Sequence, residues 1–424
     1  MRPRLALLLG ALVAPALPLL VGAPASAATN ICVGSPPGCP AGSTTYATIP
    51  DAISHAASGD KIYVGPGSFS DGPYVLPAGV SIQGSGAGTG ASATVLTLAA
   101  GPQTYLTADG GNVSDLRISM PSGNGATGIA ATNGSVVDNV VVLGAGSTSS
   151  TGLRTQTATA HDVTVNVTGG SGNTAVSAAG PVNTFTDSTW NGGAVGLRLA
   201  SGSTTVSRIT VRGAGTAIRV EAGSLAIDDT VLDLGAAGTA GLLAQPATGT
   251  ADVTAGFLTV VGRAAGSRGV VASPTGSGTA TVTLTSSIVR GPATSLVRDG
   301  GPASLTVTRS DYESASGGVT DGGGNLVGVD PAFIDAATGN YDLRAGSPVI
   351  DKGGVASSAA QDRAGRTRSF DGDRDRVAVP DMGAYELHDV TPPTTVITSG
   401  PSGPTNDNTP VFTFRSGPDV TFAC

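Results

Sequence analysis

The chain has 424 residues, a formal net charge of −8 and only 4% aromatic residues, while 40% of its residues are hydrophobic. This length allows a core of ordinary size, and the acidic balance argues against binding to nucleic acid or to anionic membrane surfaces. The hydrophobic residues are grouped in short β-branched runs that disordered chains lack, and helical periodicity is nearly absent. The sequence therefore predicts an ordered all-β chain that is rich in turns.

Residues 1–27 have the features of a secretory signal peptide. Arg2 and Arg4 supply the positive start, Leu5 to Val21 form the apolar stretch, and Ala25-Ser26-Ala27 is a cleavage site of small residues. Two prolines interrupt the apolar stretch, which disfavours the alternative of an uncleaved membrane anchor. Cleavage removes both arginines and takes the net charge from −8 to −10. We expect a secreted or cell-surface bacterial protein with no membrane span in the mature chain.

Cys32 and Cys39 stand close together in the expected N-terminal segment, residues 28–43. In an exported protein such a pair predicts a small disulfide loop, whereas a metal site would need more ligands than this segment offers. Cys424, the last residue, has no obvious partner.

Residues 44–83 predict a short helix followed by strands. Thr48 can cap the helix, Pro50 suits its first turn, and Gly59 ends it. Its apolar face combines Ile49, Ile53, Ala56 and Ala57. The strands are expected at Lys61–Val64 and Val80–Ile82. Such a helix would cover the open apolar end of a stack of β-coils and block edge pairing.

A two-part phrase recurs from about residue 110 to residue 300. Its first part is a polar pair followed by β-branched or apolar residues, as in Asp138-Asn139-Val140 and His161-Asp162-Val163. Its second part is a small residue plus an aliphatic residue, as in Gly152-Leu153. The aliphatic residue recurs every 21 to 28 residues, at Ile129, Leu153, Val176, Leu197, Ile218, Leu242, Val270 and Leu296. A period of this size indicates stacked structural units.

Each repeat supplies side chains for the inside of a coil. The eight aliphatic residues would stack along one inner wall, with strands about 4.8 Å apart. A second wall would contain Leu116, Val140, Val163 and Ile209. Gly, Asn and Ser between the two parts of the phrase supply the turns, because Gly and Asn accept positive φ angles.

The run from Tyr46 to Phe69 contains Ser58-Gly59-Asp60, Ile62-Tyr63-Val64 and Gly65-Pro66-Gly67. It resembles the entry segment of right-handed parallel β-helix proteins of the pectin-lyase-like superfamily, and the later repeats resemble the parallel β-helix repeat. The resemblance covers about residues 44–320 and implies a β-helix over residues 44–324 with a capping helix at its start. Because this superfamily contains lyases, hydrolases, esterases and noncatalytic surface proteins, it names no activity.

Residues 325–388 change character. They contain Asn340-Tyr341-Asp342-Leu343, Gly346-Ser347-Pro348-Val349-Ile350-Asp351 and Asp381-Met382-Gly383-Ala384-Tyr385-Glu386. This block resembles the terminal module known as the choice-of-anchor Q domain, found after β-helix repeats in exported bacterial proteins. The resemblance implies surface or extracellular deployment, and no chemistry.

Residues 389–424 resemble a linker and the first strands of a bacterial Ig-like domain, in which Val420 to Cys424 match the strand that carries the first cysteine. Only about a third of the usual ~100 residues of such a domain are present. We expect the chain to end within this truncated domain, and a true C-terminus is the alternative.

One column of polar residues on the repeats could contact a ligand. Arg198 and Arg219 follow the stacked aliphatic residue on adjacent coils, Arg154 has the same position two coils earlier, and Glu221 lies nearby. Such a column could bind an acidic sugar chain through its guanidinium groups. Outward-facing arginines that only solubilise the rod are the alternative.

The other ionisable residues indicate no catalytic set. Asp228 and Asp229, with Asp233 nearby, offer paired carboxylates, but the first two are consecutive and face opposite sides of a strand unless a bulge intervenes. His161 opens a repeat phrase and is expected to be a turn residue. No string typical of pectate lyases, pectin esterases or polygalacturonases is present, so no catalytic residue is assigned.

The acidic run from Phe370 places Asp371, Asp373 and Asp375 at the alternate positions of a calcium loop. Arg376 and Met382 stand where the EF-hand pattern needs Gly and a bidentate Glu. We interpret the run as an exposed charged loop, with structural calcium at these three aspartates as the alternative and no other cofactor expected.

Taken with the predicted export, these features favour a monomeric, noncatalytic extracellular rod that binds polysaccharide or other cell-envelope components, and no nucleic acid. The alternative is a carbohydrate-active enzyme of the polysaccharide lyase or glycoside hydrolase type.

Overall fold

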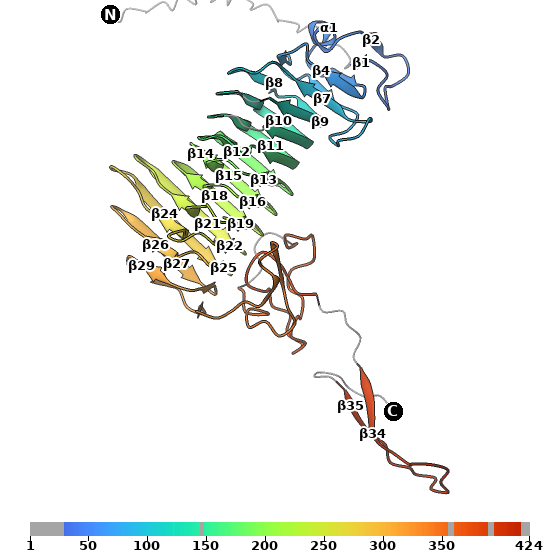
Figure 1. The fold of residues 1–424 in the computed structure, drawn as a ribbon, viewed down its shortest axis with the longest axis vertical. Helices are drawn as coiled ribbons and strands as arrows, with labels where there is room; N and C mark the ends of the chain where they lie inside the picture. Colours follow the sequence, from blue (N-terminus) through green and yellow to red (C-terminus); the bar gives the residue numbers. More distant parts are fainter. Residues whose placement is uncertain (1–28, 122, 145–147, 355–359, 389–393, 417–424) are drawn as a thin grey trace, which may run out of the picture.

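The computed structural model describes residues 29–416 apart from residues 122, 145–147, 355–359 and 389–393. Its body is an all-β solenoid in which neighbouring coils pair through parallel ladders (Figure 1). The right-handed parallel β-helix predicted from the repeats is thereby confirmed. The predicted signal peptide, residues 1–27, and Cys424 lie outside the described residues.

The coils contribute strands to three sheets, here named A, B and C. β10 (Thr127–Gly144) and β11 (Thr151–Asn166) bend through all three, β12 (Thr174–Thr186) through A and B, and β9 (Asn112–Met120) through B and C. Sheet A also contains β5 (Tyr74–Val75), β8 (Thr104–Asp109), β14 (Val195–Leu199), β17 (Thr216–Val220), β20 (Ala240–Ala244), β23 (Arg268–Ala272), β26 (Thr294–Arg298) and β29 (Ala315–Ser316). Sheet B also contains β1 (Asn30–Val33), β2 (Thr44–Tyr46), β3 (Lys61–Val64), β6 (Ser81–Gln83), β15 (Ser203–Ser207), β18 (Gly223–Asp228), β21 (Thr250–Gly256), β24 (Thr279–Thr285), β27 (Ala303–Thr308) and β30 (Thr320–Asp321). Sheet C also contains β4 (Gly67–Phe69), β7 (Thr94–Thr97), β13 (Thr189–Asn191), β16 (Thr210–Arg212), β19 (Val231–Asp233), β22 (Thr259–Val261), β25 (Ile288–Arg290), β28 (Asp311–Tyr312) and β31 (Leu326–Val327).

The predicted inner wall of eight aliphatic residues lies in register on sheet A. Ile129 pairs with Leu153, and the pairing continues coil by coil to Leu296, with all eight side chains fully buried. The small residue before each aliphatic lies where sheets A and C close the coil. A Cβ on Gly152 would collide with Val165, and a Cβ on Gly196 would collide with Val211. The second part of the phrase is therefore small because the valines of sheet C occupy the space.

The first part of the phrase forms the bend between sheets B and C. Its second polar residue has a positive φ, which is 56° at Asp115, 49° at Asn139 and 51° at Asp162. Asp and Asn tolerate this left-handed conformation better than most residues, which explains the polar pair. Later coils place Arg208 and Phe257 in the same conformation, so the bend depends on the coil and not on one residue type.

The second predicted wall contains buried Leu116, Val140, Val163 and Ile209, but Ser188 stands between the last two. The Ser188 hydroxyl accepts a hydrogen bond from the Val163 amide at 3.0 Å and donates one to the Thr186 carbonyl at 2.8 Å. Because both partners lie on the backbone, this buried polar group is satisfied without a polar neighbour in the core.

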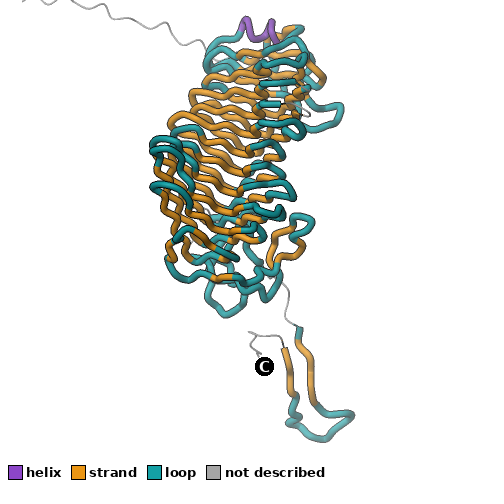
Figure 2. The backbone as a smooth tube through the Cα atoms, turned by 60° about the vertical axis from the view of Figure 1, so that its left-hand side comes forward, coloured by secondary structure: helices purple, strands orange, loops and turns teal. Residues whose placement is uncertain are grey.

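The predicted capping helix is α1 (Ile49–His55), which covers one end of the stack (Figure 2). The Thr48 hydroxyl accepts a hydrogen bond from the Asp51 amide at 3.2 Å, which confirms the prediction that Thr48 caps this helix. The helix ends at His55 and not at Gly59. Its buried residues are Ile49 and Ala52. Ala57 was predicted on the apolar face but is exposed, because the helix ends before it.

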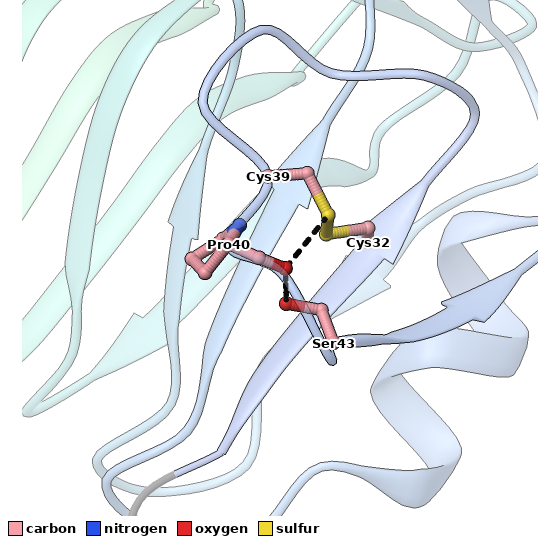
Figure 3. The surroundings of a disulfide bond; sticks show 4 residues. All are labelled: Cys32, Cys39, Pro40 and Ser43. Atoms are coloured by element: carbon pink, nitrogen blue, oxygen red, sulfur yellow. Dashed lines mark hydrogen bonds between the residues drawn. A yellow bond between two sulfur atoms is a disulfide. The ribbon is translucent and has the colours of Figure 1, made fainter.

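The predicted disulfide between Cys32 and Cys39 is present (Figure 3). It closes a loop directly after β1, and β1 itself pairs with β3 of the solenoid. Directly after this loop the Ser43 hydroxyl donates to the Pro40 carbonyl at 2.7 Å. The loop is therefore fixed to the first coil.

Residues 328–388 are here called the terminal module, and its described residues pack against sheet C from β16 to β25 with little regular structure. Their strands are the antiparallel pair β32 (Phe333–Asp335) and β33 (Asn340–Leu343). Buried carboxylates organise the rest by accepting backbone hydrogen bonds: Asp362 from Ala364, Arg366 and Glu386, and Asp381 from Asp351 and Leu387. The acidic residues of this block therefore hold its loops together.

Arg368 joins the terminal module to the solenoid. Its guanidinium donates to Asp229 Oδ1 and to Glu386 Oε2, and it stacks over the Phe257 ring at 4.2 Å. All three charged side chains are essentially fully buried. Because an unpaired charge is costly in such a place, this contact fixes the position of the terminal module.

After the terminal module, β34 (Thr395–Ser399) and β35 (Thr413–Ser416) form an antiparallel hairpin, drawn apart from the coil stack in Figure 1. Among the described residues, none of the helices is long and apolar enough to span a membrane.

Candidate functional site

The predicted arginine column lies on the outer face of sheet A. Arg198 of β14 pairs in register with Arg219 of β17, and Ser177 of β12 separates Arg198 from Arg154 of β11. Arg154 and Arg198 are exposed, and Arg219 is partly exposed. Parallel strands are about 4.8 Å apart, so the guanidinium groups of Arg198 and Arg219 emerge from neighbouring coils.

Glu221 organises the two neighbouring arginines. Its carboxylate accepts from Arg198 at 3.0 Å and 2.6 Å and lies 3.5 Å from Arg219 Nε. These hydrogen bonds raise the pKa of Arg198. Arg219 also donates to Gln245 at 2.9 Å, and Arg154 donates to Thr127 Oγ1 at 3.0 Å. Arg154, Arg198 and Arg219 are here called the positive strip. Because three guanidinium groups lie near one carboxylate, the strip has a net positive charge, and the hydrogen bonds hold the arginine side chains in place.

The column ends where the next coils place Leu243, Val271 and Val297 at the same position. These residues form a buried apolar cluster with Ala240. The positive strip is therefore confined to the coils that contain β11 to β17.

A polar ladder at the bend between sheets B and C was not predicted. His161 Nδ1 lies 2.7 Å from Asp138, His161 Nε2 lies 3.5 Å from Asp187, and Arg208 binds Asp187 at 2.7 Å and 2.6 Å. The hydrogen bonds from Arg208 lower the pKa of Asp187. His161 is 52% exposed, and it ends the sheet B part of β11, directly before the left-handed Asp162. A repeat phrase with polar residues at the same position of consecutive coils could have indicated this ladder.

Asp229 and Asp233, two of the carboxylates considered as a pair in the sequence, bind different partners and do not form a shared site. Asp229 occupies the left-handed bend and binds Arg368 as described above, while Asp233 pairs with Arg263 at 3.1 Å. Burial raises the pKa of Asp229 to about 7, and Arg368 opposes this shift. Asp229 therefore serves docking of the terminal module.

Of the three aspartates in the acidic run, for which calcium binding was the alternative interpretation, the structure brings together Asp371 and Asp373, and it adds Asp351. One carboxylate oxygen from each lies within 4.8 Å of the others. Asp375 is not in this group, and its carboxylate accepts a hydrogen bond from the Val377 amide at 2.8 Å. Asp351 already accepts three backbone hydrogen bonds, from Gly372, Asp373 and Val379.

Two open cavities lie between the end of the solenoid and the terminal module. The larger, about 640 Å³, is lined by hydroxyl groups, glycines and Arg309, together with the apolar run Ala378-Val379-Pro380. The other, about 540 Å³, is here called the sheet C cavity and is lined by Val261, Arg263, Arg290, Gly291, Glu313, Asp330, Pro331, Phe333, Ala336 and Ala337. Sequence reasoning could not find it, because it combines β22, β25 and β28 with a loop of the terminal module.

Asp311 lies beside Arg290, which lines the sheet C cavity, but Asp311 is not itself one of the lining residues. Its side chain is fully buried, and the polar groups that favour its ionised form are Arg290 and the backbone amide of Val329. The Arg290 Nε atom is 3.7 Å from Asp311 and 3.6 Å from Glu313, and Arg290 Nη1 is buried without a partner in the described chain. Burial raises the pKa of Asp311 to about 7; Arg290 opposes the shift, while Glu313 and Asp330 add to it.

Comparison with known proteins identifies the fold and no family. No family model matches the sequence, and no curated protein matches it. Among solved structures, the chain is similar to pectate lyase Pel9A, with a TM-score of 0.55 and 14% identity over 85% of this chain and 97% of that chain. At this identity the likeness supports the parallel β-helix alone.

Two further structures align at low TM-scores. They are the A-module of mannuronan C-5 epimerase AlgE4 from Azotobacter vinelandii (TM-score 0.29, 12% identity, 66% of this chain and 91% of that chain) and the catalytic unit of a GH87 α-1,3-glucanase from Streptomyces thermodiastaticus (TM-score 0.26, 18% identity, 66% of each chain). Neither likeness is close enough to carry an argument.

Proposed function

We propose that this chain is a secreted or cell-surface β-helix protein that binds acidic polysaccharide without cleaving it. The observation that carries the proposal is the positive strip on sheet A, in which Arg198 and Arg219 lie in register and are held by Glu221. Guanidinium groups form charge-assisted, often bidentate hydrogen bonds with carboxylates. The predicted signal peptide, the disulfide and the β-helix shared with a pectate lyase support an extracellular carbohydrate partner.

The domain arrangement belongs to the same proposal. We infer a signal peptide at residues 1–27, an N-terminal segment at 28–43, a β-helix at 44–324, a choice-of-anchor Q-type module at 325–388, and a linker with Ig-like strands at 389–424. The motifs quoted for the last two regions support their extracellular deployment, and we expect the mature chain to be a monomer.

Affinity electrophoresis of the mature chain in gels that contain polygalacturonate tests the binding. We expect retardation in these gels and none in gels that contain dextran, a neutral polymer. In polygalacturonate gels the double variant Arg198→Ala/Arg219→Ala should migrate at the rate that it shows in dextran gels. The control is Arg376→Ala, which removes an exposed arginine of the terminal module and should be retarded as much as the wild type. Equal retardation of the double variant and the wild type would exclude the sheet A strip.

A carbohydrate-active enzyme of the lyase or hydrolase type is the second candidate, favoured by one observation. That observation is the β-helix that the chain shares with a pectate lyase. Release of unsaturated or reducing ends from polygalacturonate or alginate in the presence of Ca²⁺ would establish it. Absence of release with retained binding supports the noncatalytic proposal.

We also propose that the acidic run from Phe370 binds a structural calcium ion. Asp371 and Asp373 lie beside Asp351, and Asp371 Oδ1 is buried without a hydrogen-bond partner among the described residues. Calcium prefers carboxylate oxygens. If calcium binds, 2 mM Ca²⁺ (a concentration of the order that weak extracellular sites need) should raise the unfolding temperature of the wild type and of Asp375→Asn, but not that of Asp371→Asn. No shift in the wild type excludes the site.

A further inference from the structure

The larger of the two cavities is here called the bend cavity. The solenoid contributes the bend between sheets B and C on two neighbouring coils, where Thr285 pairs in register with Thr308 and the left-handed residues Ser286 and Arg309 follow them. Its volume of about 640 Å³ lies in the range of small-molecule sites. The terminal module contributes the other lining residues, which are Gly353, Gly354, Ser369, Ala378, Val379 and Pro380.

Hydrogen bonds join the two sides of the bend cavity. The Gly354 amide donates to the Ser286 hydroxyl at 2.7 Å, and the Gly383 amide donates to the Ser286 carbonyl at 2.8 Å. The Gly353 amide donates to the Pro380 carbonyl at 2.8 Å, which connects the two segments of the terminal module that line the cavity. Because these segments are already fixed, a ligand would not have to order them when it binds.

Arg309 gives the bend cavity its charge. It is exposed, and its guanidinium lies beside the two glycines, with Nη1 3.5 Å from the Gly353 carbonyl oxygen and Cδ 3.5 Å from where a Cβ on Gly354 would stand. This one long hydrogen bond is its only side-chain partner within the described chain, so Arg309 has no carboxylate partner there. A guanidinium offers five donors, and most of those of Arg309 are therefore free for a ligand.

The charges around Arg309 favour an anion. Among the described residues that line the bend cavity, none is acidic. Asp228, two coils before Thr285 in the same column, has its Oδ1 atom against Gly256 and does not line the cavity. A cation would meet Arg309 without a compensating carboxylate, whereas a carboxylate would form charge-assisted hydrogen bonds with it.

The remaining lining residues favour an anion that also has hydroxyl groups. The hydroxyls of Thr285, Thr308 and Ser369 can each donate and accept a hydrogen bond. The run Ala378-Val379-Pro380 adds an apolar surface. A purely apolar ligand would cover the guanidinium and the hydroxyl groups without replacing their hydrogen bonds to water, which is costly.

We propose that the bend cavity binds a small hydroxylated carboxylate, a sugar acid, with its carboxylate on Arg309 and its hydroxyl groups on Thr308 and Ser369. The bend cavity and the positive strip share no residue, and the strip lies on sheet A. The inference therefore holds whether or not the strip binds acidic polymers.

Saturation-transfer NMR on the mature chain tests the ligand class, with galacturonate and glucuronate as probes. We expect saturable binding of at least one of them at millimolar concentration. Methyl galactoside, which lacks the carboxylate, and acetate, which lacks the hydroxyl groups, should each bind about tenfold more weakly or less, because each loses one set of contacts. If either comparison compound binds as tightly as the sugar acids, the proposed ligand class is wrong.

Three variants test the location of the site. Arg309→Gln removes the charge and keeps an amide donor, and it should weaken sugar-acid binding at least about tenfold. Thr308→Val keeps the shape of the side chain and removes its hydroxyl, and it should weaken binding about fivefold. The control is Arg415→Gln, at an exposed arginine of the hairpin, which should bind as the wild type.

The outcomes separate this inference from the proposed function. Unchanged sugar-acid binding by Arg198→Ala/Arg219→Ala, together with unchanged retardation of Arg309→Gln by polygalacturonate, supports the bend cavity as an independent site. If the wild type binds neither sugar acid, or if Arg309→Gln and Thr308→Val both bind them as the wild type does, the inference is wrong. If Arg309→Gln does not fold, Thr308→Val alone decides.

Discussion

At the scale of single residues, Asp311 and Asp187 are both aspartates beside an arginine, yet their surroundings move their pKa values in opposite directions. Asp187 accepts two short hydrogen bonds from Arg208, which lower its pKa. Asp311 is fully buried and its nearest guanidinium nitrogen is 3.7 Å away, so burial dominates and raises its pKa to about 7. Asp187 therefore stabilises the folded state when it is ionised, whereas Asp311 favours the folded state when it is neutral.

Asp311→Asn should stabilise the protein at pH 8 and change little at pH 4. Because the folded-state pKa of Asp311 lies above its usual 3.8, the wild type loses stability as pH rises from about 4 to about 7. Asp187 acts in the opposite sense and loses its contribution only at lower pH. Urea unfolding at both pH values should show a gain on the order of 2 to 4 kcal/mol at pH 8 only. The same difference at both pH values would contradict the raised pKa.

At the scale of the elements, the repeat phrase predicts most of one coil. The stacked aliphatic residues from Ile129 to Leu296 occupy the expected inner wall, because a period of this length leaves one side chain per coil at each inner position. Ser188 inside the second wall was not predicted, since its satisfaction depends on backbone atoms of the neighbouring coil. The left-handed bend at Phe257 was also hidden, because that residue type gives no turn signal.

Gly152→Ala tests the closure of the coil. The new Cβ would meet Val165 in a packed interior, which should cost about 1 to 3 kcal/mol of unfolding free energy. Gly88→Ala is the matched control, since no heavy atom lies within 4 Å of its added Cβ. Equal stability of both variants in urea unfolding would show that the second part of the phrase is not small for steric reasons.

At the scale of the whole molecule, the terminal module and the solenoid are joined by contacts that sequence cannot place. Arg368 and Asp229 are 139 residues apart, and nothing in either segment marks them as partners. The arginine column could be predicted, since it follows from register alone. The sheet C cavity could not, because it depends on how residues 328–337 fold back over β22, β25 and β28.

Arg368→Ala should loosen the terminal module. The change leaves Asp229 and Glu386 buried without their cation, which should cost about 3 to 5 kcal/mol. Limited proteolysis should then cleave within residues 328–388 under conditions in which the wild type and the exposed-site control Arg376→Ala stay intact. Protection equal to the wild type would mean that other contacts dock the module.

The central claim is that a preorganised positive strip on sheet A binds acidic polysaccharide, and the dissociation constant for polygalacturonate tests it most directly. Arg198→Ala/Arg219→Ala should weaken binding at least tenfold, a loss of about 1.4 kcal/mol. Glu221→Gln should tighten it, because both guanidinium groups lose the carboxylate that competes with the polymer. Opposite shifts in these two variants are the result the account predicts. Dissociation constants equal to that of the wild type in both variants, or no binding by the wild type, would contradict it.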